Sequence, residues 1–283
     1  MLHLSRFAPL SQRYDGFILD LWGVIHDGVT PYPGAVDCLT RLRDAGKRTV
    51  LLSNAPRRSA SLQESMRAMG IDDGLYSDIL SSGEAVFRAL KDPLDQWWAE
   101  LGTRVFHLGP DRDRGVIDGL DLVRVASPDL ADFVLNTGPD DERSHSDLDE
   151  FEEVLQDCAT HRLPMVCANP DLEVIREGRR VLCAGALAVR YEELGGSVRS
   201  LGKPDPAIYQ PVLELLGVVP ERVLAVGDAL RTDIAGAQGV AIDSCWVLGG
   251  IHAAELRGDP ALADAAVREA GLAPVACVPG FQW

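Results

Sequence analysis

The sequence predicts an α/β protein built on a parallel sheet, with a second α/β domain inserted into the first. Three observations support this. Short apolar runs rich in β-branched residues recur along the chain, most of them are followed by a turn and a helical pattern, and the same alternation starts again in the middle of the chain. Such alternation indicates parallel strands joined by crossover helices.

The outer parts of the chain contribute four of these strands. Their sequences are FILDLW (17–22), TVLLSN (49–54), VLAVGD (223–228) and SCWVLGG (244–250). Ligands of open parallel sheets bind beyond the carboxyl ends of the strands. Asp20, Ser53 and Asp228 stand at the ends of three of these runs, so we expect them to meet at one edge of the sheet.

The middle of the chain has an α/β rhythm of its own. The expected strands are RVFHLG (104–109), ADFVLNTG (131–138) and PMVCANPD (164–171), and the expected helices are LDEFEEVLQDCATH (148–161) and LCAGALAVRYEELGG (182–196). Period-3.6 apolar spacing and a closing glycine identify the helices. We therefore predict a core of residues 1–82 and 201–283, with an inserted domain of residues 83–200.

Composition excludes several classes of function. The chain has 283 residues, of which 46% are hydrophobic and 25% charged, as in ordinary globular proteins. Its formal net charge of −16 disfavours nucleic acid as a partner. We expect no membrane partner and a cytoplasmic location, because no run approaches the ~20 apolar residues of a membrane span and the first residues lack a signal-peptide core. The six cysteines have no CxxC spacing, so we expect them to be reduced and buried.

Five side chains, in chain order, are those that phosphoryl transfer to a carboxylate needs. Asp20 is the candidate nucleophile, which would form an aspartyl-phosphate intermediate. Ser53 and Lys203, the latter in LGKPDP, are candidates to hold the phosphate oxygens as charge redistributes. Asp228 and Asp233, in GDALRTD, complete the set. Ordinary alternatives are a helix cap for Ser53 and a surface charge for Lys203.

The carboxylates predict a magnesium site. Mg²⁺ prefers octahedral oxygen ligands and keeps several waters. Asp20 and Asp228 would bind it directly. Asp233 would either bind it directly or lie behind the direct ligands. The ion would also reduce repulsion between a carboxylate nucleophile and an anionic substrate.

The segments DLWGVIHDG, LLSNA, ILSSGEA, GKPDP and GDALRTDIAGA, in this order, resemble the motifs of the haloacid-dehalogenase superfamily. More narrowly, the chain is similar to the class IIA group of nucleotide, sugar and nitrophenyl phosphatases. The resemblance covers nearly the whole chain. It implies a Rossmann-like core with an α/β cap domain, inserted between the second and third motifs, and the backbone carbonyl of Trp22 as a further metal ligand.

Trp22 departs from the family pattern. The phosphatases usually carry Asp-x-Asp at the first motif, and the second Asp is their general acid and base. Indole has no proton that titrates near neutral pH. His26 and Asp27 are candidate substitutes for the missing acid and base. Alternatively, Asp27 begins a turn with Gly28 and His26 packs nearby.

Two further segments are candidates for substrate binding. Asn54 follows Ser53 directly, at the start of a predicted helix where N–H groups favour phosphate. VCANPD resembles the family's cap segment that faces the active site, which makes Asn169 and Asp171 candidates. An ordinary Asn-Pro-Asp turn explains that segment equally well.

We therefore expect a Mg²⁺-dependent phosphatase that acts on a small phosphorylated metabolite. A phosphate-binding or regulatory protein without efficient turnover is the alternative that Trp22 favours. Metal-independent dehalogenation is a third hypothesis, since true haloacid dehalogenases carry an aromatic residue at this position. Homodimers formed through the cap occur in related proteins, so a homodimer stays open.

Overall fold

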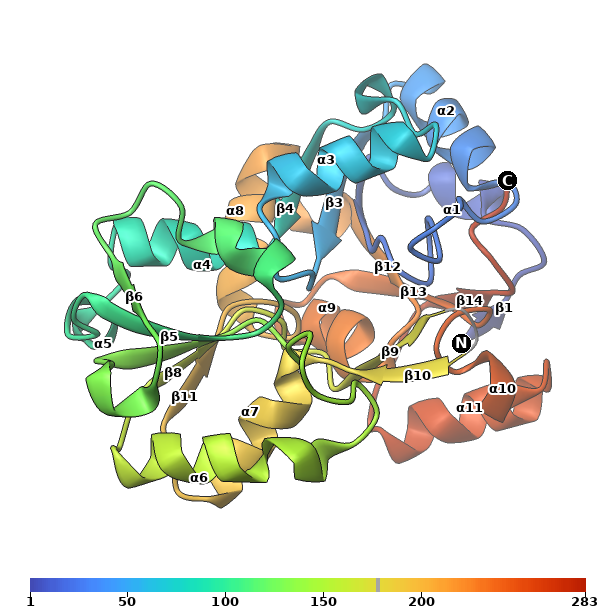
Figure 1. The fold of residues 1–283 in the computed structure, drawn as a ribbon. Helices are drawn as coiled ribbons and strands as arrows, with labels where there is room; N and C mark the ends of the chain where they lie inside the picture. Colours follow the sequence, from blue (N-terminus) through green and yellow to red (C-terminus); the bar gives the residue numbers. More distant parts are fainter. Residues whose placement is uncertain (177–178) are drawn as a thin grey trace. The chain divides into compact units, whose positions relative to one another are not determined.

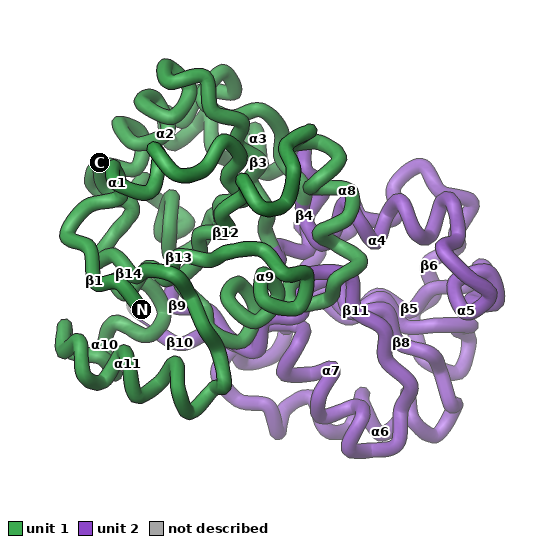
Figure 2. The backbone as a smooth tube through the Cα atoms, turned by 180° about the vertical axis from the view of Figure 1, so that it is seen from behind, with its two compact units in different colours: residues 1–53, 60–80, 203–283 green, residues 54–59, 81–202 purple. Residues whose placement is uncertain are grey.

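A computed structural model describes residues 1–176 and 179–283 of the chain. The chain divides into two compact units, coloured separately in Figure 2. Unit 1 comprises residues 1–53, 60–80 and 203–283, and unit 2 comprises residues 54–59 and 81–202. Both units are built from parallel strands and helices, which confirms the α/β fold class. The function of unit 2 as a cap stays a prediction.

Unit 1 contains a seven-stranded sheet in the order β1-β14-β13-β12-β2-β3-β4. Figure 1 labels these strands except β2. The pairings from β1 through to β3 are all parallel. The strands are β1 Leu2–His3, β2 Gly16–Leu19, β3 Arg48–Ser53, β4 Asp78–Ser81, β12 Val223–Gly227, β13 Asp243–Val247 and β14 Ala276–Val278. Non-sequential neighbours in this order require crossover connections, as the alternating sequence predicted.

The centre of this sheet positions the site. Every residue of β2 and of β12 is buried, as expected for apolar runs in strands covered on both faces. In the register, Leu19 of β2 pairs with Val226 of β12 and with Leu51 of β3. The residues that follow these strands therefore leave the sheet at the same edge.

Helices connect the strands of unit 1, and short 3-10 or π turns extend some of them. They are α1 Ala8–Ser11, α2 Ala35–Asp44, α3 Ser59–Ala68, η1 Asp73–Leu75, α8 Pro206–Leu216, η5 Pro220–Arg222, η6 Leu230–Ile234, α9 Ala235–Gly239, α10 Ala253–Leu256 and α11 Pro260–Glu269. Local sequence defines α8 at both ends. Asp205 caps its start by accepting from the N–H of Ala207, and Gly217 ends it in the left-handed conformation.

Unit 2 contains a five-stranded sheet in the order β11-β8-β7-β5-β6, also with parallel pairings. Its strands are β5 Arg104–Leu108, β6 Val123–Val125, β7 Phe133–Asn136, β8 Met165–Cys167 and β11 Val198–Ser200. Its helices and 3-10 turns are α4 Ser82–Lys91, α5 Gln96–Ala99, η2 Asp111–Val116, η3 Pro128–Leu130, η4 Leu148–Phe151, α6 Glu152–Thr160 and α7 Ala184–Glu193.

An antiparallel pair, β9 Glu173–Arg176 and β10 Arg179–Leu182, also belongs to unit 2. The sequence reasoning missed it. Its residues are half-buried or exposed, so they lack the continuous apolar run that marks the buried strands.

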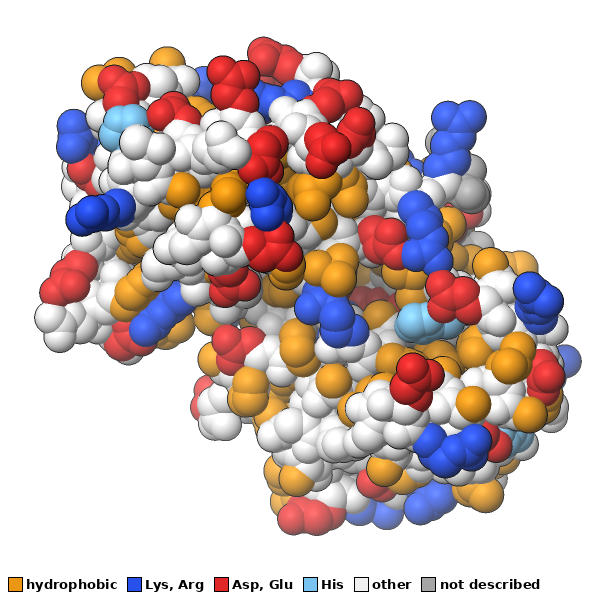
Figure 3. Space-filling model, turned by 90° about the horizontal axis from the view of Figure 1, so that it is seen from below, with side chains coloured by type: hydrophobic (Ala, Val, Ile, Leu, Met, Phe, Trp, Pro, Cys, Tyr) orange, Lys and Arg blue, Asp and Glu red, His pale blue; other side chains and the backbone are white. Residues whose placement is uncertain are grey.

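Side-chain burial agrees with the composition. All six cysteines are buried and free, as predicted. Acidic and basic side chains are interspersed on the face drawn in Figure 3. Among the described residues, no helix combines the length and apolar character that crossing a membrane requires.

Candidate active site

Asp20 follows β2 directly, at the carboxyl edge of the sheet in unit 1. Its backbone N–H donates to the carbonyl of Val226 over 2.9 Å, which continues the pairing of β2 with β12 by one residue. Its side chain is buried. The end of the strand therefore holds this carboxylate in a fixed position.

Lys203 contacts two of the predicted carboxylates. Its ammonium donates to Asp20 Oδ1 over 2.6 Å and to Asp233 Oδ1 over 2.7 Å. Lys203 stands shortly before α8 and is only 3% exposed. A buried ammonium between two carboxylates offsets part of their charge.

Asp20, Asp228 and Asp233 form one cluster, in which each offers an oxygen within 4.8 Å of the others. Asp228 follows β12, and its Oδ2 accepts from the N–H of Ile251 over 2.6 Å. Asp233 lies in η6, and its Oδ2 accepts from the N–H of Ala229 over 3.1 Å. Backbone donors thus orient two of the three carboxylates.

Three glycines make room for these carboxylates, and the sequence reasoning missed them. A Cβ at Gly23 or Gly250 would lie 2.1 Å or 2.0 Å from Asp228 Oδ2. A Cβ at Gly227 would lie 2.0 Å from the carboxyl carbon of Asp233. Gly23 also has φ of +87°, which favours glycine. The available signal was that Gly23 and Gly227 stand in the segments that carry the acids, whereas Gly250 ends a strand run without an acid.

The electrostatics of the cluster suit a divalent cation. Burial raises the pKa of Asp20 well above its usual range, and the negative charges of Asp233 and Asp228 raise it further, whereas Lys203 lowers it. Three carboxylates and one ammonium leave an excess of negative charge in a buried place. Oxygen ligands at this spacing fit Mg²⁺, which would offset that charge.

Two family models match the chain: "haloacid dehalogenase-like hydrolase" over residues 17–123 and "HAD-hydrolase-like" over residues 200–272. Mouse (Mus musculus) chronophin is 32% identical over 231 residues, which cover 77% of this chain and 75% of chronophin. The chain belongs to the haloacid-dehalogenase superfamily. Within it, the chain falls in class IIA, as the motifs suggested, and it is a phosphoric monoester hydrolase.

Solved structures agree with this assignment. A haloacid dehalogenase-like hydrolase from Brucella suis is 32% identical, with a TM-score of 0.83 over 98% of this chain and 99% of that one. The glycerol phosphate phosphatase of Mycobacterium tuberculosis in complex with magnesium is 26% identical, with a TM-score of 0.63 over 86% of this chain and 70% of that one.

Trp22 packs within its own turn. Its ring lies so close to Gly28 that a Cβ there would come within 2.2 Å of a ring atom, and Gly28 has φ of +90°. The rings of Trp22 and His26 meet edge to face, with centroids 5.9 Å apart.

His26 and Asp27, the candidate acid and base, have structural contacts. His26 is buried, its Nδ1 accepts from the N–H of Gly28 over 3.0 Å, and burial lowers its pKa to about 4. Such an imidazole is a weak base near neutral pH. Asp27 Oδ1 accepts from the N–H groups of Val29 and Thr30 over 2.9 Å and 2.7 Å. These contacts favour the alternative in which Asp27 forms the turn and His26 packs nearby.

The other candidates of this haloacid-dehalogenase hydrolase divide between the two units. Ser53 ends β3 and is buried at the same sheet edge as Asp20. Asn54, Asn169 and Asp171 all belong to unit 2. There, Asn54 Nδ2 donates to Asp171 Oδ1 over 2.8 Å, and Asn169 Oδ1 accepts from the N–H of Asp171 over 3.0 Å. The structure thus brings Asn54 together with the segment 169–171.

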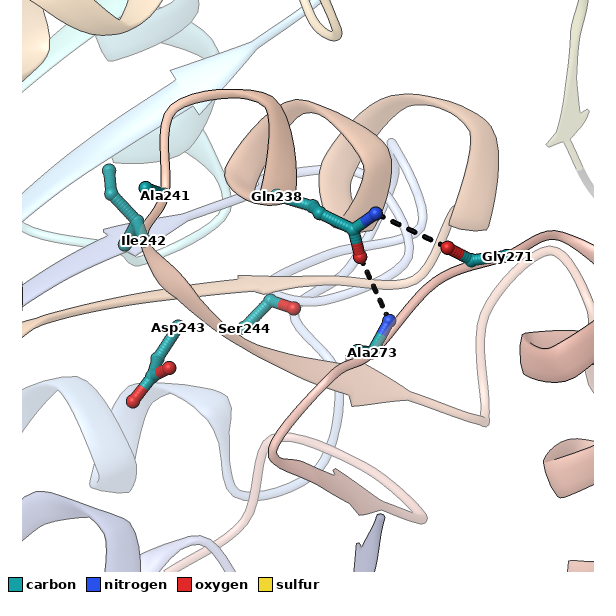
Figure 4. A pocket seen from close by; sticks show the side chains of 7 residues that line it. All are labelled: Gln238, Ala241, Ile242, Asp243, Ser244, Gly271 and Ala273. Atoms are coloured by element: carbon teal, nitrogen blue, oxygen red, sulfur yellow. Dashed lines mark hydrogen bonds between the residues drawn. The ribbon is translucent and has the colours of Figure 1, made fainter.

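A pocket in unit 1 lies away from these residues (Figure 4). Its lining includes Asp243 and Ser244, at the amino end of β13, whereas the carboxylates gather at the carboxyl edge of the same sheet. The side-chain amide of Gln238 spans this pocket by donating to the carbonyl of Gly271 and accepting from the N–H of Ala273. The pocket is therefore separate from the candidate active site.

Proposed function

We propose that this enzyme hydrolyses small phosphate monoesters with Asp20 as the nucleophile and Mg²⁺ as the cofactor. The observation that supports this best is the buried cluster of Asp20, Asp228 and Asp233 with the ammonium of Lys203 against two of its members. The glycerol phosphate phosphatase of known structure acts on a small phosphate monoester, as its name states, and was solved with magnesium.

The proposed reaction has two displacements at phosphorus. A carboxylate oxygen of Asp20 attacks phosphorus while the bond from phosphorus to the ester oxygen breaks, and the ester oxygen leaves with the bonding electrons and takes a proton from solvent. Water then attacks the phosphorus of the aspartyl phosphate and gives up a proton to solvent, while the bond from phosphorus to the Asp20 oxygen breaks; inorganic phosphate is released and the carboxylate of Asp20 is restored. The ammonium of Lys203 and the hydroxyl of Ser53 hold the oxygens that do not react.

The carboxylates of Asp20, Asp228 and Asp233 would hold the magnesium ion, and the backbone carbonyl of Trp22 is a further proposed ligand. When bound, the ion offsets negative charge on the carboxylates and on the phosphoryl group. Asp228 and Asp233 would keep their orientation through the N–H groups of Ile251 and Ala229.

Trp22 determines which leaving groups are favoured in this proposal. Since indole cannot protonate a leaving oxygen, esters of acidic alcohols such as nitrophenol should react faster than alkyl phosphates. General acid catalysis contributes typically ~10²–10⁴-fold, so the difference should be large. The class IIA relatives are phosphatases, which favours turnover over phosphate binding alone.

The decisive experiment measures nitrophenol release from nitrophenyl phosphate by the wild-type chain and by Asp20→Asn. We expect release that needs Mg²⁺, is suppressed by a chelator and is lost in Asp20→Asn. Release that is unchanged in Asp20→Asn, or absent from the wild type with Mg²⁺, would contradict the proposal.

A further inference from the structure

The polypeptide crosses between the two units four times, after Ser53, Ser59, Leu80 and Gly202. Two of these crossings adjoin proposed catalytic residues. Ser53 is the last residue of unit 1 before the first crossing, and Lys203 is the first residue of unit 1 after the last crossing. Both groups that would hold phosphate oxygens are thus covalent neighbours of residues in unit 2.

Those two neighbours, Asn54 and Gly202, lie together within unit 2. A Cβ on Gly202 would come within 2.7 Å of Asn54 Oδ1 and 2.8 Å of the ring of Pro170. On its other side, the amide of Asn54 donates from Nδ2 to Asp171 Oδ1 over 2.8 Å. We call Asn54, Pro170, Asp171 and Gly202 the Asn54 clip.

The clip is anchored in the fold of unit 2. The N–H of Asp171 donates to Asn169 Oδ1 over 3.0 Å, and its carbonyl accepts from the N–H of Gly185 in α7 over 3.0 Å. A Cβ on Gly185 would lie 2.5 Å from that carbonyl oxygen, so only glycine allows this approach of the helix. Asn169 is buried and follows shortly after β8. Hydrogen bonds therefore fix both the backbone N–H and the backbone carbonyl of Asp171.

We propose that Asn54 and Asp171 are positioning residues. Their hydrogen bond keeps Ser53 and Lys203 in fixed positions relative to each other. This inference rests on the proposed function. Consecutive Cα atoms are about 3.8 Å apart, so restraining Asn54 and Gly202 at one place also restrains Ser53 and Lys203. A misplacement of about 1 Å in a catalytic group can lower the rate about 10²-fold. In this proposal Asn54 and Asp171 position the catalytic groups, whereas the sequence had made them candidates for direct substrate binding.

The test reverses the direction of the hydrogen bond. Asn54→Asp places two carboxylates against each other, whereas the double variant Asn54→Asp with Asp171→Asn restores one donor and one acceptor. The matched control is Tyr191→Phe, which removes one buried hydrogen bond of unit 2, from the Tyr191 hydroxyl to the carbonyl of Leu163 at 2.7 Å. The measurements are kcat and KM for nitrophenyl phosphate with Mg²⁺, and thermal unfolding of each variant.

We expect Asn54→Asp to lower kcat by roughly 10- to 100-fold with a smaller change in KM. The double variant should recover most of that loss. Tyr191→Phe should lower the unfolding temperature while kcat is kept.

Two results would overturn the clip while the proposed function stands, that is, while wild-type activity depends on Asp20. One is a double variant no better than Asn54→Asp, which means that the substrate itself needs the amide at position 54. The other is an Asn54→Asp variant whose kcat is unchanged, like that of Tyr191→Phe. A wild type without activity overturns the proposed function and removes the role of the clip with it.

Discussion

The ammonium of Lys203 donates to the carboxylate of Asp20 over 2.6 Å, between residues 183 positions apart in the sequence. The same ammonium also bonds Asp233, and all three side chains are buried. Burial raises the pKa of Asp20, the charges of Asp233 and Asp228 raise it further, and Lys203, the positive partner in the cluster, lowers it. The ion pair of Lys203 and Asp20 therefore links the stability of the fold with the proposed catalysis.

Replacing Lys203 by Met should damage both activity and stability. We expect kcat for nitrophenyl phosphate to fall by at least ~10²-fold, because a donor to the phosphate oxygens is lost. The metal-free protein should lose about 3–5 kcal/mol, because the buried carboxylates lose their partner. Lys47→Met is the control, since Lys47 pairs with Asp15 and the carbonyl of Tyr14 away from the cluster. Equal kcat values for the two variants would contradict the role of Lys203.

Replacing Asp228 by Asn should separate metal binding from folding. Without metal, the variant should unfold at a temperature equal to or above that of the wild type, because one of three repelling carboxylates becomes neutral. The wild type should gain about 2.7 kcal/mol at a Mg²⁺ concentration 100 times Kd, and the variant should gain much less. Thermal unfolding with and without Mg²⁺ measures both effects. A similar Mg²⁺ shift in the two proteins would rule out Asp228 as a ligand.

Gly250→Ala should displace the carboxylate of Asp228, because it adds a Cβ next to it. The added Cβ would lie 2.0 Å from Asp228 Oδ2, so the carboxylate must move. We expect a loss of about 1–3 kcal/mol and a smaller Mg²⁺ shift in thermal unfolding. Gly239→Ala in α9 is the control, because its Cβ would meet nothing within 4 Å. If both variants respond alike to Mg²⁺, the space at Gly250 has no part in metal binding.

His107 should make the protein less stable in acid. Burial lowers the pKa of this imidazole from 6.5 to about 4, while its Nε2 lies 2.8 Å from Thr137 Oγ1. The unfolded chain binds the proton first, so the contribution of neutral His107 is complete above pH 6.5 and is lost as the pH falls toward 4. The loss is at most about 1.4 kcal/mol per pH unit.

Denaturant unfolding at pH 7 and pH 5 tests this contribution. His107→Gln should depend less on pH than the wild type, whereas His161→Gln, at an exposed position, should behave like the wild type. Equal pH dependence in all three proteins would contradict the prediction.

Trp22→Asp should change the preference for leaving groups. A carboxyl group at position 22 can protonate the leaving oxygen, so hydrolysis of an alkyl phosphate should gain at least ~10-fold relative to nitrophenyl phosphate. The ratio of the two rates is the measurement, because it cancels any loss of folded protein. Trp22→Phe, which keeps an aromatic ring, should leave the ratio unchanged. An unchanged ratio in Trp22→Asp would mean that position 22 does not face the leaving group.

The sequence by itself was sufficient for the fold class and for the main strands. β2, β3 and β12 are continuous apolar runs followed by polar residues, and the burial of parallel strands on both faces imposes that pattern locally. The topology of such sheets also indicated that Asp20 and Asp228 leave at one edge. Superfamily membership followed from motifs that are local in sequence. The roles of these residues stay predictions.

Only the tertiary structure decided the contacts between segments far apart in the chain. It paired Lys203 with both Asp20 and Asp233, left room for Asp228 at Gly250, and paired Asn54 with Asp171. The physical reason is the separation in sequence of the interacting residues. Strand patterns depend on neighbours along the chain. The pairing of charges and the room for a carboxylate depend on which distant segments folding brings within a few ångströms of each other.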